Sequence, residues 1–212
     1  MNKTASPVKW FLPSLVVLAA GLAAVLTGAA PRFAASAAEM IDFPQFYLGI
    51  ALAVVIAFAF GAIRYSLSVG WTLGLISLHD LLVTLAVTAL VSLALPQAVI
   101  LPVLILFAPV FTFANSLTVI RAARDLRAAN SIRDMSNQEA AEKATASTRG
   151  LRIGGAVLAL VFLAAAAAGG VKLAGALLPL LIGLLVSLAS SCFLTGKVWL
   201  LTGAKSLRSS GK

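Results

Sequence analysis

The sequence predicts an all-α, polytopic membrane protein with six transmembrane helices. Hydrophobic residues make up 61% of the 212-residue chain and charged residues only 11%, whereas about a quarter of the residues in a typical soluble domain are charged. Six segments reach the roughly 20 mostly apolar residues that a membrane-spanning helix requires. The lysines and arginines also collect on one side of a six-span arrangement, as they do in membrane proteins.

The expected spans follow the apolar runs, and only one connection between them is long. That connection, residues 121–150, is polar and rich in helix formers. We expect one or two short helices there at the membrane surface, and a solvated charge run is favoured over a binding site. The six expected spans are residues 9–28, 45–64, 71–94, 98–120, 151–170 and 175–200.

Three regions follow from these spans. Residues 1–44 form an N-terminal anchor with a short external loop, 45–202 a five-helix region that includes the long connection, and 203–212 a basic tail. The first span also has features of a cleaved signal peptide, because "AASAAE" at 34–39 has a small-x-small pattern. Its apolar run of about 18 residues exceeds the usual 7–15 of a signal peptide, so we expect a retained anchor. A mature N-terminus near Glu39 would contradict this expectation.

Basic residues predict the orientation. Fourteen of the 16 lysines and arginines lie on one side of the six-span arrangement, and only Arg32 and Lys172 lie on the other. The positive-inside rule therefore predicts that both termini and the connection 121–150 are cytoplasmic. Because topology accounts for the net charge of +9, no nucleic-acid partner is implied.

The sequence has few of the motifs that are typical of enzymes. The single cysteine, Cys192, excludes an internal disulfide, and the chain has one histidine, no CxxC and no phosphate-binding loop. We therefore expect no metal site, no cofactor and no ordinary hydrolase or oxidoreductase activity.

Asp80 is the one acidic residue expected inside a span. Inserting an aspartate at a helix centre costs about 2.5–3.5 kcal/mol, so such a residue indicates function. No lysine or arginine lies mid-span, and His79 is expected to project about 100° away around the helix. An aspartate without a basic partner can alternate between a protonated and an ionised state, which is the simplest kind of proton carrier.

Hydroxyl and amide side chains are expected at the same depth as Asp80. Its own helix carries a stripe at helical spacing that should face protein or water. The fourth and sixth spans would add further polar groups, so that three helices form one layer, as a proton or ion relay requires. For any one of these hydroxyls, a structural role is favoured over a role in a relay, because serine and threonine in spans commonly bond to the i−4 carbonyl and allow close helix packing. The stripe is Ser77, Thr84 and Thr88, and the added groups are Asn115, Ser116, Ser187, Ser190, Ser191 and Cys192.

The stretch "RYSLSVGWTLGLISLHDLLVTLAVTALVSL" (64–93) resembles SecF proteins, the partners of SecD in the accessory complex of the bacterial Sec translocon. The similarity runs over about residues 45–202 and follows the order of the elements. Arg64 and Tyr65 end the second span, His79 and Asp80 lie in the third, Asn115 precedes arginines in the fourth, and Ser190 and Ser191 form a pair in the last.

The resemblance implies a half-transporter of the resistance-nodulation-division type, whose six spans pair with six of SecD about a pseudo-twofold axis. It places the protein in the bacterial cytoplasmic membrane, the cell inner membrane. The implied partners are a SecD-like subunit, the SecY translocon, a preprotein substrate and the lipid membrane. The implied proton relay consists of Asp80, His79, Asn115, Ser190 and Ser191, with Arg121 and Arg124 at its cytoplasmic end.

Two features depart from the SecF pattern. Only residues 29–44 separate the first two spans, where SecF has a folded external domain, so the chain is expected to be a shortened form. In the fourth span, Ser116 replaces an acidic residue, and Arg121 with Ala122 replaces an Asp-Arg pair. Arg124 is the better match to the arginine of that pair.

Three functions remain open at this point. The first is a SecF-like translocase subunit that uses the proton motive force. The second is a passive scaffold of the translocon or of an insertase, without proton coupling. The third is a small proton-coupled exporter of the same superfamily.

Overall fold

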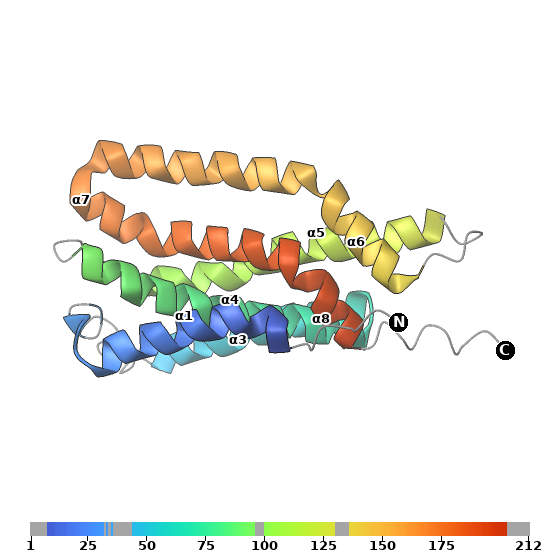
Figure 1. Ribbon diagram of the computed structural model, residues 1–212, viewed down its shortest axis with the longest axis horizontal. Helices are drawn as coiled ribbons and strands as arrows, with labels where there is room; N and C mark the ends of the chain where they lie inside the picture. The colour runs from blue at the N-terminus through green and yellow to red at the C-terminus, as the bar shows by residue number, and fades with distance from the viewer. Residues whose placement is uncertain are drawn as a thin grey trace.

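The computed structural model describes residues 8–31, 33, 35, 44–95, 100–129 and 136–202. Within these residues the regular secondary structure is helical, and no strand is present. The long helices lie side by side along the long axis of the molecule (Figure 1). The predicted all-α class is confirmed.

Five helices are long and apolar enough to cross a membrane. The longest reverses direction at Gly170, whose φ of 68° and ψ of −170° glycine adopts readily. Its two arms, 149–169 and 171–193, run antiparallel (Figure 1) and are each about 20 residues long, enough for one crossing. Counted by arms, the described residues contain six segments long and apolar enough to cross a membrane, close to the six predicted spans. The five helices are α1 (Val8–Leu26), α3 (Pro44–Arg64), α4 (Leu67–Ala94), α5 (Phe107–Ala129) and α7 (Arg149–Phe193).

Helix α4 is the central helix and packs against α1, α3, α5 and α7. Glycines permit the closest of these contacts, because small residues let helix backbones approach in membranes. A Cβ atom on Gly70 of α4 would lie only 2.7 Å from the carbonyl oxygen of Phe58 on α3, and one on Gly21 of α1 would lie 2.6 Å from Cβ of Ala86. The close packing buries most of the circumference of α4.

The helix ends differ from the predicted spans. Helix α4 begins at Leu67 rather than 71, because Ser66 caps it by accepting a hydrogen bond from the Val69 amide at 3.4 Å. The expected span 98–120 is a 3₁₀ turn, η1 (Pro102–Leu106), followed by α5, which continues to Ala129. The expected span 175–200 is interrupted at Leu194, after which the short α8 (Thr195–Leu201) begins.

The polar connection contains one separate short helix, α6 (Asn137–Ser147), as well as the last turns of α5. Ser136 caps it by accepting from the Glu139 amide at 3.1 Å, and Lys143 pairs with Glu139 at 2.8 Å. Its buried face consists of alanines, among them Ala141 and Ala144, in a cluster with Trp199 of α8. The helix therefore packs onto the end of the bundle.

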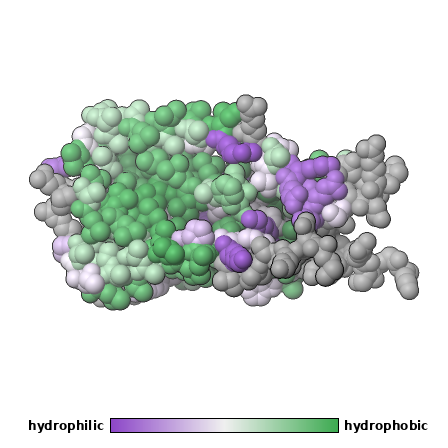
Figure 2. All heavy atoms as spheres, viewed as in Figure 1, coloured by the Kyte–Doolittle hydropathy of each residue, from purple (hydrophilic) through white to green (hydrophobic). Residues whose placement is uncertain are grey.

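The outer surface of the bundle is largely apolar. Figure 2 shows hydrophobic atoms over the middle of the molecule and most of the hydrophilic ones toward one end. Exposed apolar side chains occur on peripheral helices, such as Leu22 on α1, Ile56 on α3 and Val161 on α7, as a lipid environment requires. The described residues do not include Arg32, Glu39, most of the sequence 34–39 or the tail 203–212.

Candidate functional site: a buried carboxyl between three helices

Asp80 lies midway along the 28-residue helix α4 and is 0% exposed. The residues of the predicted stripe lie on the same buried face. Ser77 precedes Asp80 by about one turn, and Thr84 and Thr88 follow it by one and two turns, all three also at 0%. Thr88 donates to the carbonyl oxygen of Thr84 at 2.7 Å, the packing interaction expected of a hydroxyl in a span.

The Asp80 carboxyl accepts hydrogen bonds from two neighbouring helices. Thr112 Oγ1 of α5 donates to Asp80 Oδ2 at 2.6 Å, and Ser190 Oγ of the second arm of α7 donates to the same oxygen at 2.5 Å. Both distances are at the short end of the range for O–H···O hydrogen bonds. The other oxygen, Oδ1, lies 2.9 Å from Nδ1 of His79. The carboxyl thus joins α4, α5 and α7.

His79 belongs to the relay that the family resemblance implies, but helical spacing does not lead us to expect its contact with Asp80. Although consecutive helical residues project about 100° apart, the imidazole turns back so that Nδ1 reaches Asp80 Oδ1. The expectation that His79 points away and leaves Asp80 without a basic partner is therefore wrong. The ring is 15% exposed and meets Phe11 of α1 edge-on at 5.6 Å between centroids. Its Nε2 atom is buried without a hydrogen-bond partner among the described residues.

A second polar cluster adjoins the carboxyl on α5 and α7. Asn115 Nδ2 donates to Ser187 Oγ at 2.7 Å, and Ser116 Oγ lies 2.9 Å from Thr195 Oγ1 and 3.5 Å from Ser191 Oγ. The Ser187 carbonyl connects this cluster to the first, because it accepts from both Ser190 at 3.1 Å and Ser191 at 2.7 Å. Polar contacts therefore extend from Asp80 to the break between α7 and α8.

The predicted relay residues are accordingly divided between two neighbouring groups. His79 and Ser190 bond directly to Asp80, whereas Asn115 and Ser191 lie in the adjoining cluster. Cys192, expected in the same layer, is partly exposed.

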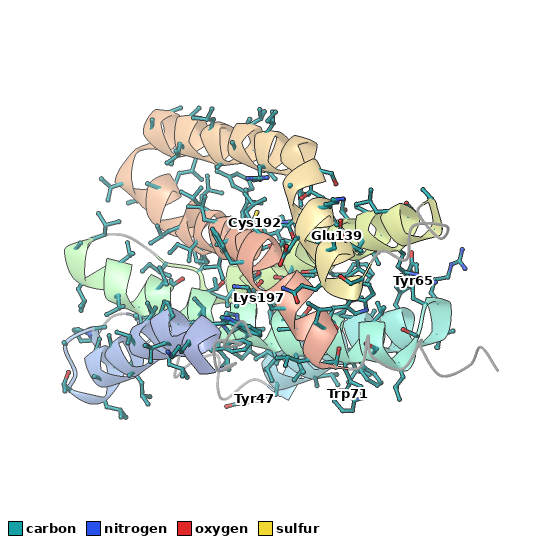
Figure 3. The ribbon with its side chains drawn as sticks, turned by 45° about the vertical axis from the view of Figure 1, so that its right-hand side comes forward. Tyr47, Tyr65, Trp71, Glu139, Cys192 and Lys197 are labelled. Carbon is teal, nitrogen blue, oxygen red and sulfur yellow. The ribbon has the colours of Figure 1, made fainter. Side chains whose placement is uncertain are left out.

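The two predicted arginines lie outside the polar layer. Arg121 and Arg124 follow Thr112 on α5 by nine and twelve residues, which places them about 14 and 18 Å further along the helix. Arg121 Nε donates instead to the Tyr65 hydroxyl at 2.6 Å. Figure 3 shows Tyr65 at one end of the bundle.

Two hydroxyls of the site are not singled out by the sequence. Thr112 precedes Asn115 and Ser116 by three and four residues, so helical spacing could have identified it as part of the same face. Thr195 lies beyond the break at Leu194. It follows Ser191 by four residues, so the same helical spacing could have identified it, although no local signal marks the break.

Two hydroxyls of the stripe, Ser77 Oγ and Thr84 Oγ1, are buried without a hydrogen-bond partner among the described residues. Buried polar groups are normally satisfied, and these two flank Asp80 on the same face. They retain hydrogen-bonding capacity on either side of the carboxyl. The described residues contain no group of three or more His, Cys, Asp or Glu side chains that could hold a metal ion.

Comparison with known proteins identifies the family of the chain. A family model described as "Protein export membrane protein SecD/SecF, C-terminal" matches residues 38–205, most of the chain. Searches of curated proteins and of solved structures found no match. The matched family is a family of export proteins rather than of enzymes, and the short segment before α3 is consistent with a shortened SecF-like protein. The chain therefore belongs to the SecD/SecF family of protein export membrane proteins.

Proposed function

We propose that this chain is a SecF-like subunit that pairs with a SecD-like subunit at the SecY translocon and uses the proton motive force to assist preprotein translocation. The observation that supports this most is the Asp80 carboxyl. It is the only acidic side chain that is buried among the described residues, and hydrogen-bonding groups on α4, α5 and α7 converge on it. A carboxyl that must be kept inside a membrane is expected to have a function.

Ser190 can accommodate either protonation state of the carboxyl. Its hydroxyl has two acceptors, Asp80 Oδ2 at 2.5 Å and the Ser187 carbonyl at 3.1 Å, but it carries a single proton. When Asp80 is ionised, the hydroxyl donates to the carboxylate. When Asp80 takes up a proton, Ser190 turns its own proton to Ser187 and accepts from the acid. The site then holds either state without an unpaired proton.

Proton movement through this layer would act on the other subunit through α4, α5 and α7, the three helices that Asp80 joins. A proton that crosses a potential of 100 mV releases about 2.3 kcal/mol, which is enough to shift a two-state equilibrium about fiftyfold. Because Asp80 bonds to both α5 and α7, a change at the carboxyl alters the packing of three helices at once.

The proposed location is the bacterial cytoplasmic membrane, with both termini and α6 in the cytoplasm. The described basic residues Arg64, Arg121 and Lys197 lie on the side assigned to the cytoplasm, and Lys172 lies beside the α7 reversal on the other. Labelling tests this in a Cys192→Ser background. A cysteine at Glu142 should resist an impermeant maleimide in intact cells, and one at Lys172 should react; the opposite pattern would overturn the orientation.

Replacement of Asp80 tests the proposed function. Asp80→Asn keeps the size of the side chain but cannot ionise, so we expect export in cells to fall to the level of cells that lack the subunit, while the complex with its SecD-like partner still co-purifies. Thr88→Val is the matched control, since Thr88 lies on the same buried face and bonds only to Thr84. Undiminished export by Asp80→Asn would refute proton coupling.

One observation favours the passive scaffold as a second candidate. Only residues 27–43 separate α1 from α3, too few for a folded external domain. A scaffold predicts that Asp80→Asn affects assembly alone or nothing, whereas a proton-coupled subunit predicts loss of export with assembly intact.

A further inference from the structure

Three arginines gather around one tyrosine at the end of the bundle where α3 passes into α4. The guanidinium carbons of Arg64, Arg121 and Arg124 lie 5.9, 5.7 and 5.1 Å from the centre of the Tyr65 ring. Arg64 ends α3, while Arg121 and Arg124 lie one turn apart on α5. Residues from two helices and the turn between α3 and α4 therefore form one site, which we call the arginine–tyrosine cluster.

No ion pair joins a carboxylate to this cluster within the part of the chain that the structure describes, and Asp125, the neighbour of Arg124 on α5, is exposed to solvent. The two ion pairs found there join His79 to Asp80 and Lys143 to Glu139. Three like charges around one ring repel one another, and an anion between them would relieve that repulsion. All three arginine side chains are exposed, so the cluster is open to a ligand from outside the protein.

The donors of the cluster suit a phosphate group. Arg121 uses Nε to bond to the Tyr65 hydroxyl, which leaves its two terminal nitrogens as a fork, the geometry that binds phosphate oxygens in pairs. The Tyr65 hydroxyl accepts that bond and keeps its own proton to donate. Arg64 and Arg124 supply the remaining charge from either side.

An apolar strip leads away from the cluster along α3. Phe60 precedes Arg64 by one turn, is 38% exposed and packs against the Tyr65 ring at 6.2 Å between centroids. Ile56, one turn further, is 61% exposed, and Ile63 beside the cluster is 87% exposed. A ligand that fits both parts has an anionic head and an apolar tail that lies along α3 within the bilayer.

We propose that the arginine–tyrosine cluster binds the phosphate of an anionic phospholipid, with an acyl chain of that lipid against Phe60 and Ile56. Basic sites at the ends of spanning helices attract such headgroups. The apolar strip favours a lipid over free phosphate or an acidic protein segment, because neither of these would use Phe60 and Ile56. This site is separate in space from the Asp80 carboxyl, because Arg121 and Arg124 lie about 14 and 18 Å beyond Thr112 along α5.

Native mass spectrometry of the purified full chain tests the proposal with phosphatidylglycerol and phosphatidylcholine of identical acyl chains. We expect phosphatidylglycerol to be retained preferentially. The variant Arg121→Gln/Arg124→Gln should bind it about thirtyfold more weakly, the effect of removing two interfacial arginines. Arg152→Gln is the matched control, because Arg152 is an exposed arginine on α7 outside the cluster. It should retain the preference, and circular dichroism checks that each variant is folded.

Competition distinguishes the other sources of an anion. Inorganic phosphate or an acidic peptide at the same concentration as the lipid should leave phosphatidylglycerol bound. Displacement by either one would assign the cluster to free phosphate or to a protein segment and overturn the proposal. Equal retention of the two lipids by the unmodified chain, or unchanged phosphatidylglycerol binding by a folded double variant, would also overturn it.

Discussion

Helix α4 and the first arm of α7 are both apolar enough to span a membrane, yet they carry different side chains in different places. Helix α4 has a hydroxyl or carboxyl at about every turn, from Thr72 to Thr88, and these are fully buried. The first arm of α7 has no polar side chain between Ile153 and Gly169, and it exposes residues such as Leu160 at 63%. Polar residues in a span thus mark the side that faces protein, and an all-apolar span lies at the periphery.

The largest expected difference between these two helices is the loss of stability when a glycine is replaced by a larger residue. Gly70→Leu on α4 would force a side chain against the backbone of Phe58 and Ala62 on α3, where Cβ alone would lie within 2.9 Å of their atoms. Since backbone atoms cannot turn aside, we expect a cost of about 3 kcal/mol or more and loss of folded protein after detergent extraction.

The matched change on the peripheral arm is Gly154→Leu, where a Cβ would meet no atom within 4 Å. Yield and thermal unfolding should stay close to those of the parent protein. If both leucine variants fold equally well, the contrast between a packed central helix and a lipid-facing peripheral one is wrong.

A smaller effect is expected at the hydroxyl that contacts the carboxyl. Ser190→Ala removes a donor to Asp80, and hydrogen bonds to charged groups contribute about 1.5–3 kcal/mol. Its neighbour Ser191 donates to the Ser187 carbonyl of its own helix, so Ser191→Ala should cost about 1 kcal/mol or less. Unfolding in detergent measures stability, and export in cells measures function. Equal losses of export for the two variants would mean that the Asp80 contact has no special role.

The smallest expected effect is at the reversal of α7. Gly170→Ala places a side chain on a residue with φ of 68° and ψ of −170°, a region that is essentially restricted to glycine and costs other residues about 1–3 kcal/mol. Gly154→Ala on the same arm lies within a helix and in open space, so it should be neutral or slightly stabilising. Thermal unfolding of both variants provides the comparison. If Gly170→Ala unfolds at the same temperature as the parent protein, the backbone at the reversal has another conformation.

The number and class of the spans could be predicted from the sequence because hydropathy reports directly on contact with lipid. Helix ends could not be predicted in the same way. Because the Ser66 side chain caps it, α4 begins one turn before the predicted span. Helix α5 continues past Ile120 because the residues that follow, mainly alanine and arginine, favour a helix in water as well as in lipid. The length of an apolar run reflects the thickness of the membrane, whereas capping side chains and helix propensity determine where a helix begins and ends.

The candidate site was partly predictable for a similar reason. Asp80 and its stripe follow from composition and helical spacing, since a charge in an apolar span is rare. The contact between His79 and Asp80 depends on a side-chain rotation, and the contact with Thr112 depends on the register between α4 and α5. Neither is encoded in the spacing of a single helix.

Asp80 is proposed to exchange a proton within the packed layer of α4, α5 and α7. Infrared difference spectroscopy of the protein in lipid measures this most directly, because a protonated carboxyl has a carbonyl stretch that a carboxylate lacks. Acidification should produce a carbonyl band that is absent in Asp80→Asn and shifted in Ser190→Ala, whose carboxyl has lost one partner. A spectrum identical in the parent protein and Asp80→Asn at every pH would contradict the account.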